Sequence, residues 1–176
     1  STGVTTSGST ATVIGNGVGI YIIKFDNDLV TTFTNTFRIS PTTAAASGYV
    51  SGMASDGTSF YITGALDNLN VNFNPKSTAI NLSTSGSQDI FVAKYNTASL
   101  VADFAYNIGT TFSDEGSGIS VDNSGNIYIT GIFRGSSLDF SPASGSVGDN
   151  TLSEFGADGS GDVYVAKYNS TFTHQW

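Results

Sequence analysis

Oxygen-bearing side chains recur at alternate positions in two short runs, a spacing that occurs in calcium-binding loops. The runs are Asp122, Ser124 and Asn126, and Asp158, Ser160 and Asp162. A Ca²⁺ ion takes about six to eight oxygen ligands, and neither run continues to the distal glutamate of an EF-hand loop. Tight turns also select Asp, Asn and Gly, so turn structure alone accounts for both runs. Calcium is therefore left open as a cofactor, with these candidate ligands: Asp122, Asn126, Asp158 and Asp162.

Aromatic residues near loops form a second set of candidates, because exposed rings stack on sugar rings. Aromatic residues make up 12% of the chain, and most of them lie in strand-like segments whose packing requires them. The candidate ligand-binding residues are the four that lie nearer to loops: Phe112, Phe133, Phe140 and Phe155. They predict carbohydrate as one alternative partner.

Residues for nucleophilic or acid–base catalysis are few. His174 is the only histidine, and the chain has no Gly-x-Ser-x-Gly nucleophile motif. Asp114, Glu115 and Glu154 offer carboxylates for glycosidic cleavage, but solvated loop acids are the commoner case. The sequence therefore predicts that the protein is not an enzyme and has no catalytic residue.

Three lysines recur at matching positions and make up half of the six basic residues: Lys24, Lys94 and Lys167. One interpretation is a ring of cations that lines a channel or a ligand site. A lysine buried without a partner is costly, however, so a recurrent lysine in an apolar run indicates a recurrent structural partner. We expect each lysine to contact an acid or carbonyl oxygens of its own repeat.

The composition is typical of a protein made of short strands and turns. Gly occurs 21 times, charged residues make up only 11%, and there is no cysteine. The net charge of −8 disfavours nucleic acid and anionic membrane surfaces as partners. No apolar run is long enough to span a bilayer, which excludes membrane insertion by a helix. The predicted fold class is all-β.

The positions of these strands follow from an internal repeat of about 70 residues. One motif begins at Gly19, Asp89 and Asp162 and reads "GIYIIKFD", "DIFVAKYN" and "DVYVAKYN". A second motif holds Tyr-Ile-Thr-Gly at 61–64 and 128–131, followed by "NFNP" at 72–75 and "DFSP" at 139–142. An aromatic residue follows each copy of the first motif at nearly constant distance: Phe33, Phe104 and Trp176.

Both repeated motifs predict β-hairpins, because runs of Val, Ile, Tyr and Phe flank turns rich in Asp, Asn and Gly. One period therefore holds four antiparallel strands. Runs such as "IFVAKY" are apolar at both odd and even positions, which face opposite sides of a sheet. This indicates a sheet that is covered on both faces. Stacked four-stranded sheets of this kind form a β-propeller, whereas solenoid repeats are shorter and a sandwich need not repeat its sequence.

The order "SGISVDNSGNIYITGIF", "LDFSP", "GDVYVAKYN" and a following aromatic resembles the SBBP-type β-propeller repeat of large bacterial extracellular proteins. The resemblance implies one blade per repeat, a secreted or cell-surface location and no general catalytic activity. It supplies no set of functional residues.

One propeller segment over residues 1–176 is expected: a half blade at 12–39, a blade at 49–107 and a blade at 116–176 that is incomplete at its C-terminus. Closed propellers have about four to eight blades, so two and a half blades leave open faces. The pattern stops within a strand at Trp176, which favours a segment of a longer propeller. Closure of a ring by several copies of the chain is the alternative.

The predicted function is that of a non-enzymatic structural, adhesion or protein-interaction module, extracellular or at the cell surface. Its expected partner is protein, either a second copy or the rest of a larger propeller. A lectin-like or calcium-dependent carbohydrate-binding propeller is the alternative.

Overall fold

A computed structural model describes residues 4–6, 9–11, 19–25, 33–41, 47–67, 70–142, 150–155 and 159–176. The regular elements in these ranges are all β-strands. None of the described residues belongs to a helix with the length and apolarity needed to cross a bilayer. The all-β prediction is confirmed.

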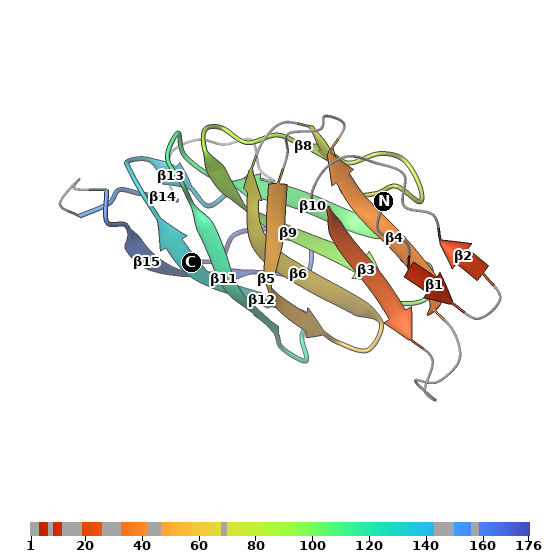
Figure 1. The fold of residues 1–176 in the computed structure, drawn as a ribbon. Coiled ribbons are helices and arrows are strands. Elements are labelled where there is room, and N and C mark those ends of the chain that lie inside the picture. Colours follow the sequence, from red (N-terminus) through yellow and green to blue (C-terminus); the bar gives the residue numbers. More distant parts are fainter. Residues whose placement is uncertain are drawn as a thin grey trace.

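The central blade is a four-stranded antiparallel sheet in which neighbours in sequence are neighbours in space (Figure 1). Its strands are β5 (Ser47–Ser55), β6 (Ser59–Asp67), β9 (Gln88–Asn96) and β10 (Ala102–Ile108). The motif "DIFVAKYN" forms β9, the third strand of the sheet in chain order. This is the four-stranded unit that the repeat predicts.

The third repeat forms a similar sheet from β11 (Glu115–Val121), β12 (Ile127–Phe133) and β15 (Asp162–Tyr168). A fourth strand begins beside β15, since Tyr168 forms a bridge with His174. The amide of Lys167 donates to the carbonyl of Trp176, and the amide of Gln175 donates to the carbonyl of Lys167. The sheet therefore has three strands and the start of a fourth.

The first repeat contributes the hairpin of β3 (Ile20–Phe25) and β4 (Phe33–Pro41). Residues 12–18 and 26–32 of the predicted half blade lie outside the described residues. The hairpin lies on one side of the central blade, and β11, β12 and β15 lie on the other side (Figure 1). The arrangement is a partial propeller, and its described residues form no closed ring.

Each repeat also carries a small accessory hairpin, which the sequence did not predict. These hairpins are β1 (Val4–Thr6) with β2 (Ser9–Ala11), β7 (Val71–Asn72) with β8 (Asn81–Leu82), and β13 (Leu138–Asp139) with β14 (Thr151–Leu152). In the central repeat, β7 pairs with β4 of the preceding repeat. The accessory hairpin thus joins two successive blades by backbone hydrogen bonds.

The outer strands share an irregularity that corrects one predicted alignment. Phe104 lies opposite Lys94, and the backbone of Trp176 bonds to Lys167, so these two aromatic residues are equivalent. Phe33, by contrast, lies opposite Phe25. The turns that precede the outer strands differ in length, so a constant spacing along the chain does not keep a constant register.

Two apolar cores lie on the two faces of the central blade. One joins β6 and β9 to the first hairpin and includes Ile39, Phe60, Ile62, Phe91 and Ala93. The other joins the opposite face to the third sheet and includes Tyr61, Ile90, Val92, Ile129 and Tyr164. Strand β6 is buried over Ser59–Leu66 and β9 over Asp89–Ala93, so the side chains on both faces of each strand are covered. This confirms the interpretation of "IFVAKY" as a strand covered on both faces.

Candidate functional site

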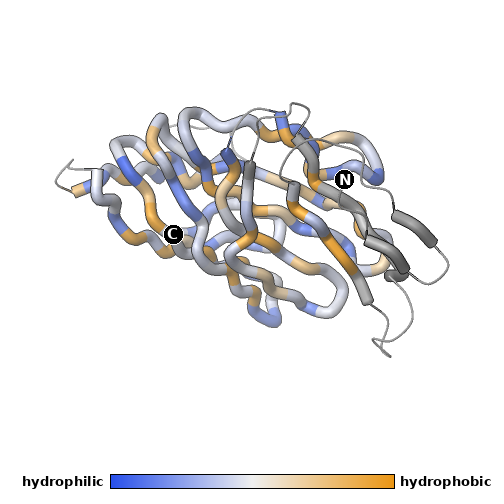
Figure 2. The backbone as a smooth tube through the Cα atoms, in the orientation of Figure 1, coloured by the Kyte–Doolittle hydropathy of each residue, from blue (hydrophilic) through white to orange (hydrophobic). Residues whose placement is uncertain are grey.

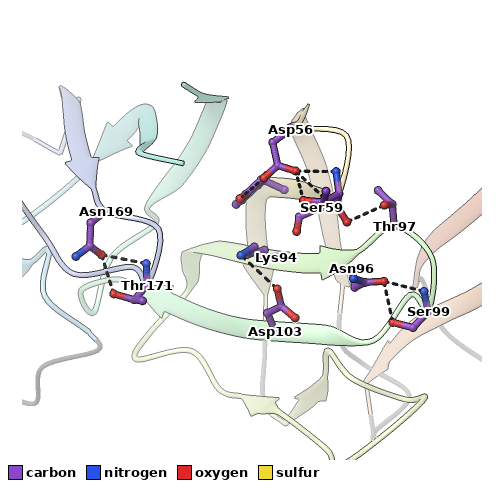
Figure 3. A network of polar contacts seen from close by, with 11 residues as sticks. Asp56, Ser59, Lys94, Asn96, Thr97, Ser99, Asp103, Asn169 and Thr171 are labelled. Carbon is purple, nitrogen blue, oxygen red and sulfur yellow. Dashed lines mark hydrogen bonds and ion pairs between the residues drawn. The ribbon is translucent and has the colours of Figure 1, made fainter. Parts of the chain in front are cut away.

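The recurrent lysines have structural contacts within their own blades. The Nζ of Lys94 lies 3.3 Å from the carboxylate of Asp103 and 5.7 Å from the ring centroid of Tyr61 (Figure 3). The Nζ of Lys167 lies 5.5 Å from the ring centroid of Tyr128, the residue equivalent to Tyr61. The side chain of Lys24 lies outside the described residues. The expectation of an acid partner is confirmed for Lys94, whereas the contact described for Lys167 is with an aromatic ring.

The aspartates of the hairpin turns hold the turn and the neighbouring tyrosine. One carboxylate oxygen of Asp122 accepts from the amides of Ser124 and Asn126, and the other accepts from the Asn126 side chain and the Tyr128 hydroxyl. The hydrogen bonds from Asn126, together with those from Ser124 and Tyr128, lower the pKa of Asp122 to about 2. The carboxylate is therefore fully engaged within its own turn.

In the central blade, Asp56 holds the equivalent turn and the neighbouring tyrosine. It accepts from the amides of Thr58 and Ser59 and from the Tyr61 hydroxyl (Figure 3). Burial alone would raise its pKa, but the hydrogen bonds from Ser59, Thr58 and Tyr61 outweigh burial and hold the pKa at about 2. Asp56 and Asp122 line a polar hollow of about 420 Å³ between the two turns.

Other polar residues of the two motifs form matching hydrogen bonds in each blade. The hydroxyls of Tyr95 and Tyr168 donate to the carbonyls of Phe73 and Phe140, at 2.7 and 2.8 Å. The hydroxyls of Thr63 and Thr130 donate to the carbonyls of Phe91 and Tyr164, both at 2.8 Å. Asn96 and Asn169 close equivalent turns by accepting from Ser99 and Thr171 (Figure 3). The repeated polar residues thus maintain the blade.

Of the calcium candidates, only Asp122 and Asn126 are brought together among the described residues, and they hydrogen-bond to each other within one turn. Asp158 lies outside these residues, and Asp162 accepts from the amide of Phe155 at 2.6 Å. In the described part of the chain, no three His, Cys, Asp or Glu side chains gather in a group that could hold a metal. Calcium binding stays a prediction.

The four aromatic candidates divide into two pairs. Phe133 and Phe140 are 2% and 3% exposed and make an edge contact with each other, so their rings are not available to a ligand. Their proximity to loops in sequence was misleading, because both rings pack in the core between the central blade and the third sheet. Phe112 and Phe155 are exposed, and only these two rings of the four face solvent.

The residues considered for catalysis are also engaged in the fold. Asp114, expected in a solvated loop, is fully buried and accepts from Thr110 and from the amide of Arg134. Glu115 lies in β11 and accepts from the Tyr49 hydroxyl at 2.8 Å. The ring of His174 lies against Phe140 and Tyr168, and desolvation lowers its pKa. These contacts hold loops and strands together.

One apolar groove lies between the first hairpin and the central blade. It has a volume of about 400 Å³ and is lined mainly by apolar side chains of β3, β5 and β6. Tyr21 and Ile23 of β3 are 45% and 39% exposed, and Met53 of β5 is 70% exposed. The groove is the first of two open apolar surfaces.

The second open surface is the outer face of β15, which is clearest beside its counterpart β9. Val163 and Val165 are 74% and 61% exposed, whereas the equivalent Ile90 and Val92 are 0% exposed. The third sheet covers Ile90 and Val92, and no described element covers the equivalent valines. The sequence predicted open blade faces but did not identify Val163 and Val165 as the exposed residues. The alignment of "DIFVAKYN" with "DVYVAKYN" nevertheless shows that they are equivalent to Ile90 and Val92.

Comparison with protein families agrees with this architecture. The family model described as SBBP, beta-propeller repeat, matches residues 104–131. The matched segment runs from β10 through β11 into β12 and so crosses the contact between the central blade and the third sheet. The predicted resemblance is confirmed for this segment. No curated protein matches the chain.

Proposed function

Because residues 104–131 match an SBBP β-propeller repeat, we propose that the chain is a non-enzymatic propeller module that binds protein through its open blade faces. The observation that carries this proposal is the contrast between Val163 and Val165 and their buried equivalents Ile90 and Val92. Burying a valine side chain contributes about 1.5–3 kcal/mol, so a partner that covers this face gains substantial free energy.

The surroundings of the β15 face support a protein partner. Trp176 is 59% exposed next to β15, and its ring centroid lies 6.4 Å from that of Tyr128. Exposed aromatic and branched apolar side chains in one patch are typical of protein interfaces. The net charge of −8 disfavours polyanionic partners.

The proposal also holds that the module has no catalytic activity and that it lies outside the cell or at the cell surface. The acids with a lowered pKa, Asp56 and Asp122, owe the shift to their own turns, which supports a structural role for them. An extracellular or cell-surface location is proposed from the resemblance to repeats of bacterial extracellular proteins. Structural, adhesion and interaction roles all require the same property, an exposed blade face that another protein covers.

The proposal is tested by the mass of the particle in solution, measured by light scattering over a concentration series. We expect the wild-type chain to associate reversibly and the double variant Val163→Asp/Val165→Asp to remain a single chain. Ser77→Asp/Thr78→Asp is the matched control, since it adds the same charge at exposed positions between β7 and β8. A wild-type mass equal to one chain at every concentration would contradict the proposal.

A carbohydrate-binding module is the second candidate, supported by Phe155, which is 91% exposed, and Phe112, which is 53% exposed. Exposed rings of this kind stack on sugars. A glycan array with and without calcium tests this candidate. Binding that is lost in Phe155→Ala or Phe112→Ala supports it, and calcium dependence supports the lectin-like form. An array without signal removes it.

A further inference from the structure

In the described part of the chain, strand β3 has a neighbouring strand on one edge only. In the central blade, β9 pairs with β6 on one side and with β10 on the other. In the third sheet, β15 pairs with β12. Among the described residues, β3 pairs with β4 alone. No described strand pairs with its second edge, which borders the apolar groove, and an edge of this kind is a template for another strand.

The side chains along this edge are exposed where their equivalents are buried. Tyr21 is 45% exposed and Ile23 is 39% exposed, while the equivalent Phe91 and Ala93 of β9 are both 0% exposed. Strand β6 pairs with β9 at these positions, with Gly64 opposite Phe91 and Ile62 opposite Ala93. Phe91 and Ala93 are buried because the first hairpin packs on their face of β9, so the exposure of Tyr21 and Ile23 shows that no described element covers the equivalent face of β3. Strand β4 pairs with β3 as β10 pairs with β9, so the second edge of β3 is the one that β6 occupies in the central blade.

The contact between the central blade and the third sheet shows how such a hairpin lies against its neighbour. Strand β11 crosses close to β5, where a Cβ on Gly52 would lie 3.1 Å from the Cα of Gly118. The hydroxyl of Ser51 donates to the carbonyl of Gly116. On the opposite face of β5, Val50 and Met53 are exposed in the groove. An inner strand against these two residues repeats the arrangement.

We propose that the groove and the second edge of β3 receive the inner β-hairpin of a further SBBP-type blade. The second strand of that hairpin pairs antiparallel with β3, and its first strand covers Val50 and Met53. This mode of binding is β-strand addition, in which backbone hydrogen bonds and apolar pockets act together. The inference rests on the proposed function, because the groove is one of the two open surfaces of the module.

The pairing of β6 with β9 fixes the register of the incoming strand. Ile62 lies opposite Ala93, whose equivalent is Ile23, and Ala65 lies opposite Ile90, whose equivalent is Ile20. A peptide with the sequence of Ser47–Asp67 is therefore the appropriate probe. Isolated hairpins are marginally stable in water, so we expect this peptide to become ordered on binding.

The first test measures the fluorescence anisotropy of the labelled Ser47–Asp67 peptide with the whole chain. We expect the wild-type chain and Val165→Asp to bind the peptide equally, and Met53→Glu to bind it at least about tenfold more weakly. Met53 is 70% exposed, so this substitution leaves the buried core intact. Equal binding of Met53→Glu, or of a scrambled peptide, would overturn the proposal.

The second test uses disulfide formation, since the chain has no cysteine of its own. Residues directly opposite in antiparallel strands lie about 4.5–5.5 Å apart at Cα, within disulfide range. We expect the Ile23→Cys chain to cross-link to the peptide with Ile62→Cys and not to the peptide with Ala65→Cys. Equal yields would exclude the proposed register.

These results separate the inference from the proposed function. If the peptide fails to bind while the wild-type chain still associates through Val163 and Val165, the groove assignment is wrong and the proposed function remains. If the peptide binds in register while the wild-type chain stays a single chain, the assignment holds and the proposed β15 interface is wrong.

Discussion

Strands β9 and β15 have almost the same sequence, yet their surroundings differ. In β9, residues 89–93 are buried without interruption, whereas in β15 buried and exposed residues alternate. The difference arises because β9 lies between two packed neighbours, whereas among the described residues β15 has a packed neighbour on one face only. An apolar strand motif therefore does not determine its own burial, since the next blade determines half of it.

The polar contacts do not follow this difference. In both blades the recurrent lysine lies over a tyrosine ring. In both blades the hydroxyl of Tyr95 or Tyr168 also donates a hydrogen bond to a carbonyl of the accessory segment. The apolar face depends on stacking, but these contacts lie within one repeat. Each blade thus combines an internal framework of polar contacts within the repeat with two apolar faces whose contribution to stability depends on the neighbouring blades. Figure 2 shows the hydrophobic residues, in orange, recurring along the strands.

The largest effects are expected at the glycine of the Tyr-Ile-Thr-Gly motif, in both blades alike. A Cβ on Gly64 would lie 1.8 Å from the carbonyl oxygen of Tyr49, and a Cβ on Gly131 would lie 1.9 Å from that of Glu115. Gly64→Ala and Gly131→Ala should each lower the free energy of unfolding by about 3 kcal/mol, because the partner strand must move. Urea denaturation measures this. A neutral effect at either position would show that the internal framework differs between blades.

The next effect separates the blades. Val92→Ala should lower the free energy of unfolding by about 2 kcal/mol, because it leaves a cavity in the core between blades. At concentrations at which the wild type is a single chain, Val165→Ala should change it by less than about 0.5 kcal/mol, because that side chain is then mostly solvated. The two substitutions are chemically identical, so urea denaturation compares the surroundings directly. Equal losses would mean that the β15 face is already covered in solution.

A smaller effect tests the hydrogen bonds that do not depend on stacking. Tyr95→Phe and Tyr168→Phe each remove a hydroxyl that donates to a carbonyl of the accessory segment. Each should cost about 1–1.5 kcal/mol, because a buried carbonyl then loses its donor. Thermal unfolding measures both variants, and a loss in one blade only would contradict the equivalence of the two frameworks.

The sequence predicted the features that recur within each repeat. Strands β6, β9, β12 and β15 follow from the Tyr-Ile-Thr-Gly and Val-Ala-Lys-Tyr motifs, because the same local contacts require the same residues. The accessory hairpin β7–β8 was missed because two-residue strands have no measurable periodicity.

The burial of candidate residues was harder to predict than the strands. Phe140 lies near a loop in sequence but is covered by the fold, and Asp114 lies in a connection that the protein buries. Exposure of Val163 depends on a neighbour that no property of β15 itself encodes. Local hydrogen bonding is thus predictable from the repeat, and long-range covering is not.

The smallest effect is the dependence of stability on pH, which has opposite signs at the turns and at the buried face. The pKa values of Asp56 and Asp122 are lowered to about 2, so their stabilising contribution is present above the unfolded pKa and is lost as pH falls through about 2. Burial, reinforced by the charge of Asp114, raises the pKa of Asp89 despite hydrogen bonds from Asn107 and Ser85. The contribution of Asp89 is therefore present below the unfolded pKa and is lost as pH rises through its folded pKa.

Urea midpoints measured from pH 2 to pH 6 distinguish these signs. Asp56→Asn and Asp122→Asn should both flatten the loss of stability at acidic pH, and to a similar extent, because the two turns make equivalent hydrogen bonds. Asp89→Asn should instead raise stability at pH 6 relative to the wild type. It removes a carboxyl group whose ionised form is disfavoured by burial and whose Oδ1 has no hydrogen-bond partner among the described residues. A parallel shift of all three variants would show that acid sensitivity does not arise from these carboxylates. A flattening at Asp56 alone would mean that the turn of the open blade is looser than that of the enclosed one, so that stacking also stabilises the internal framework.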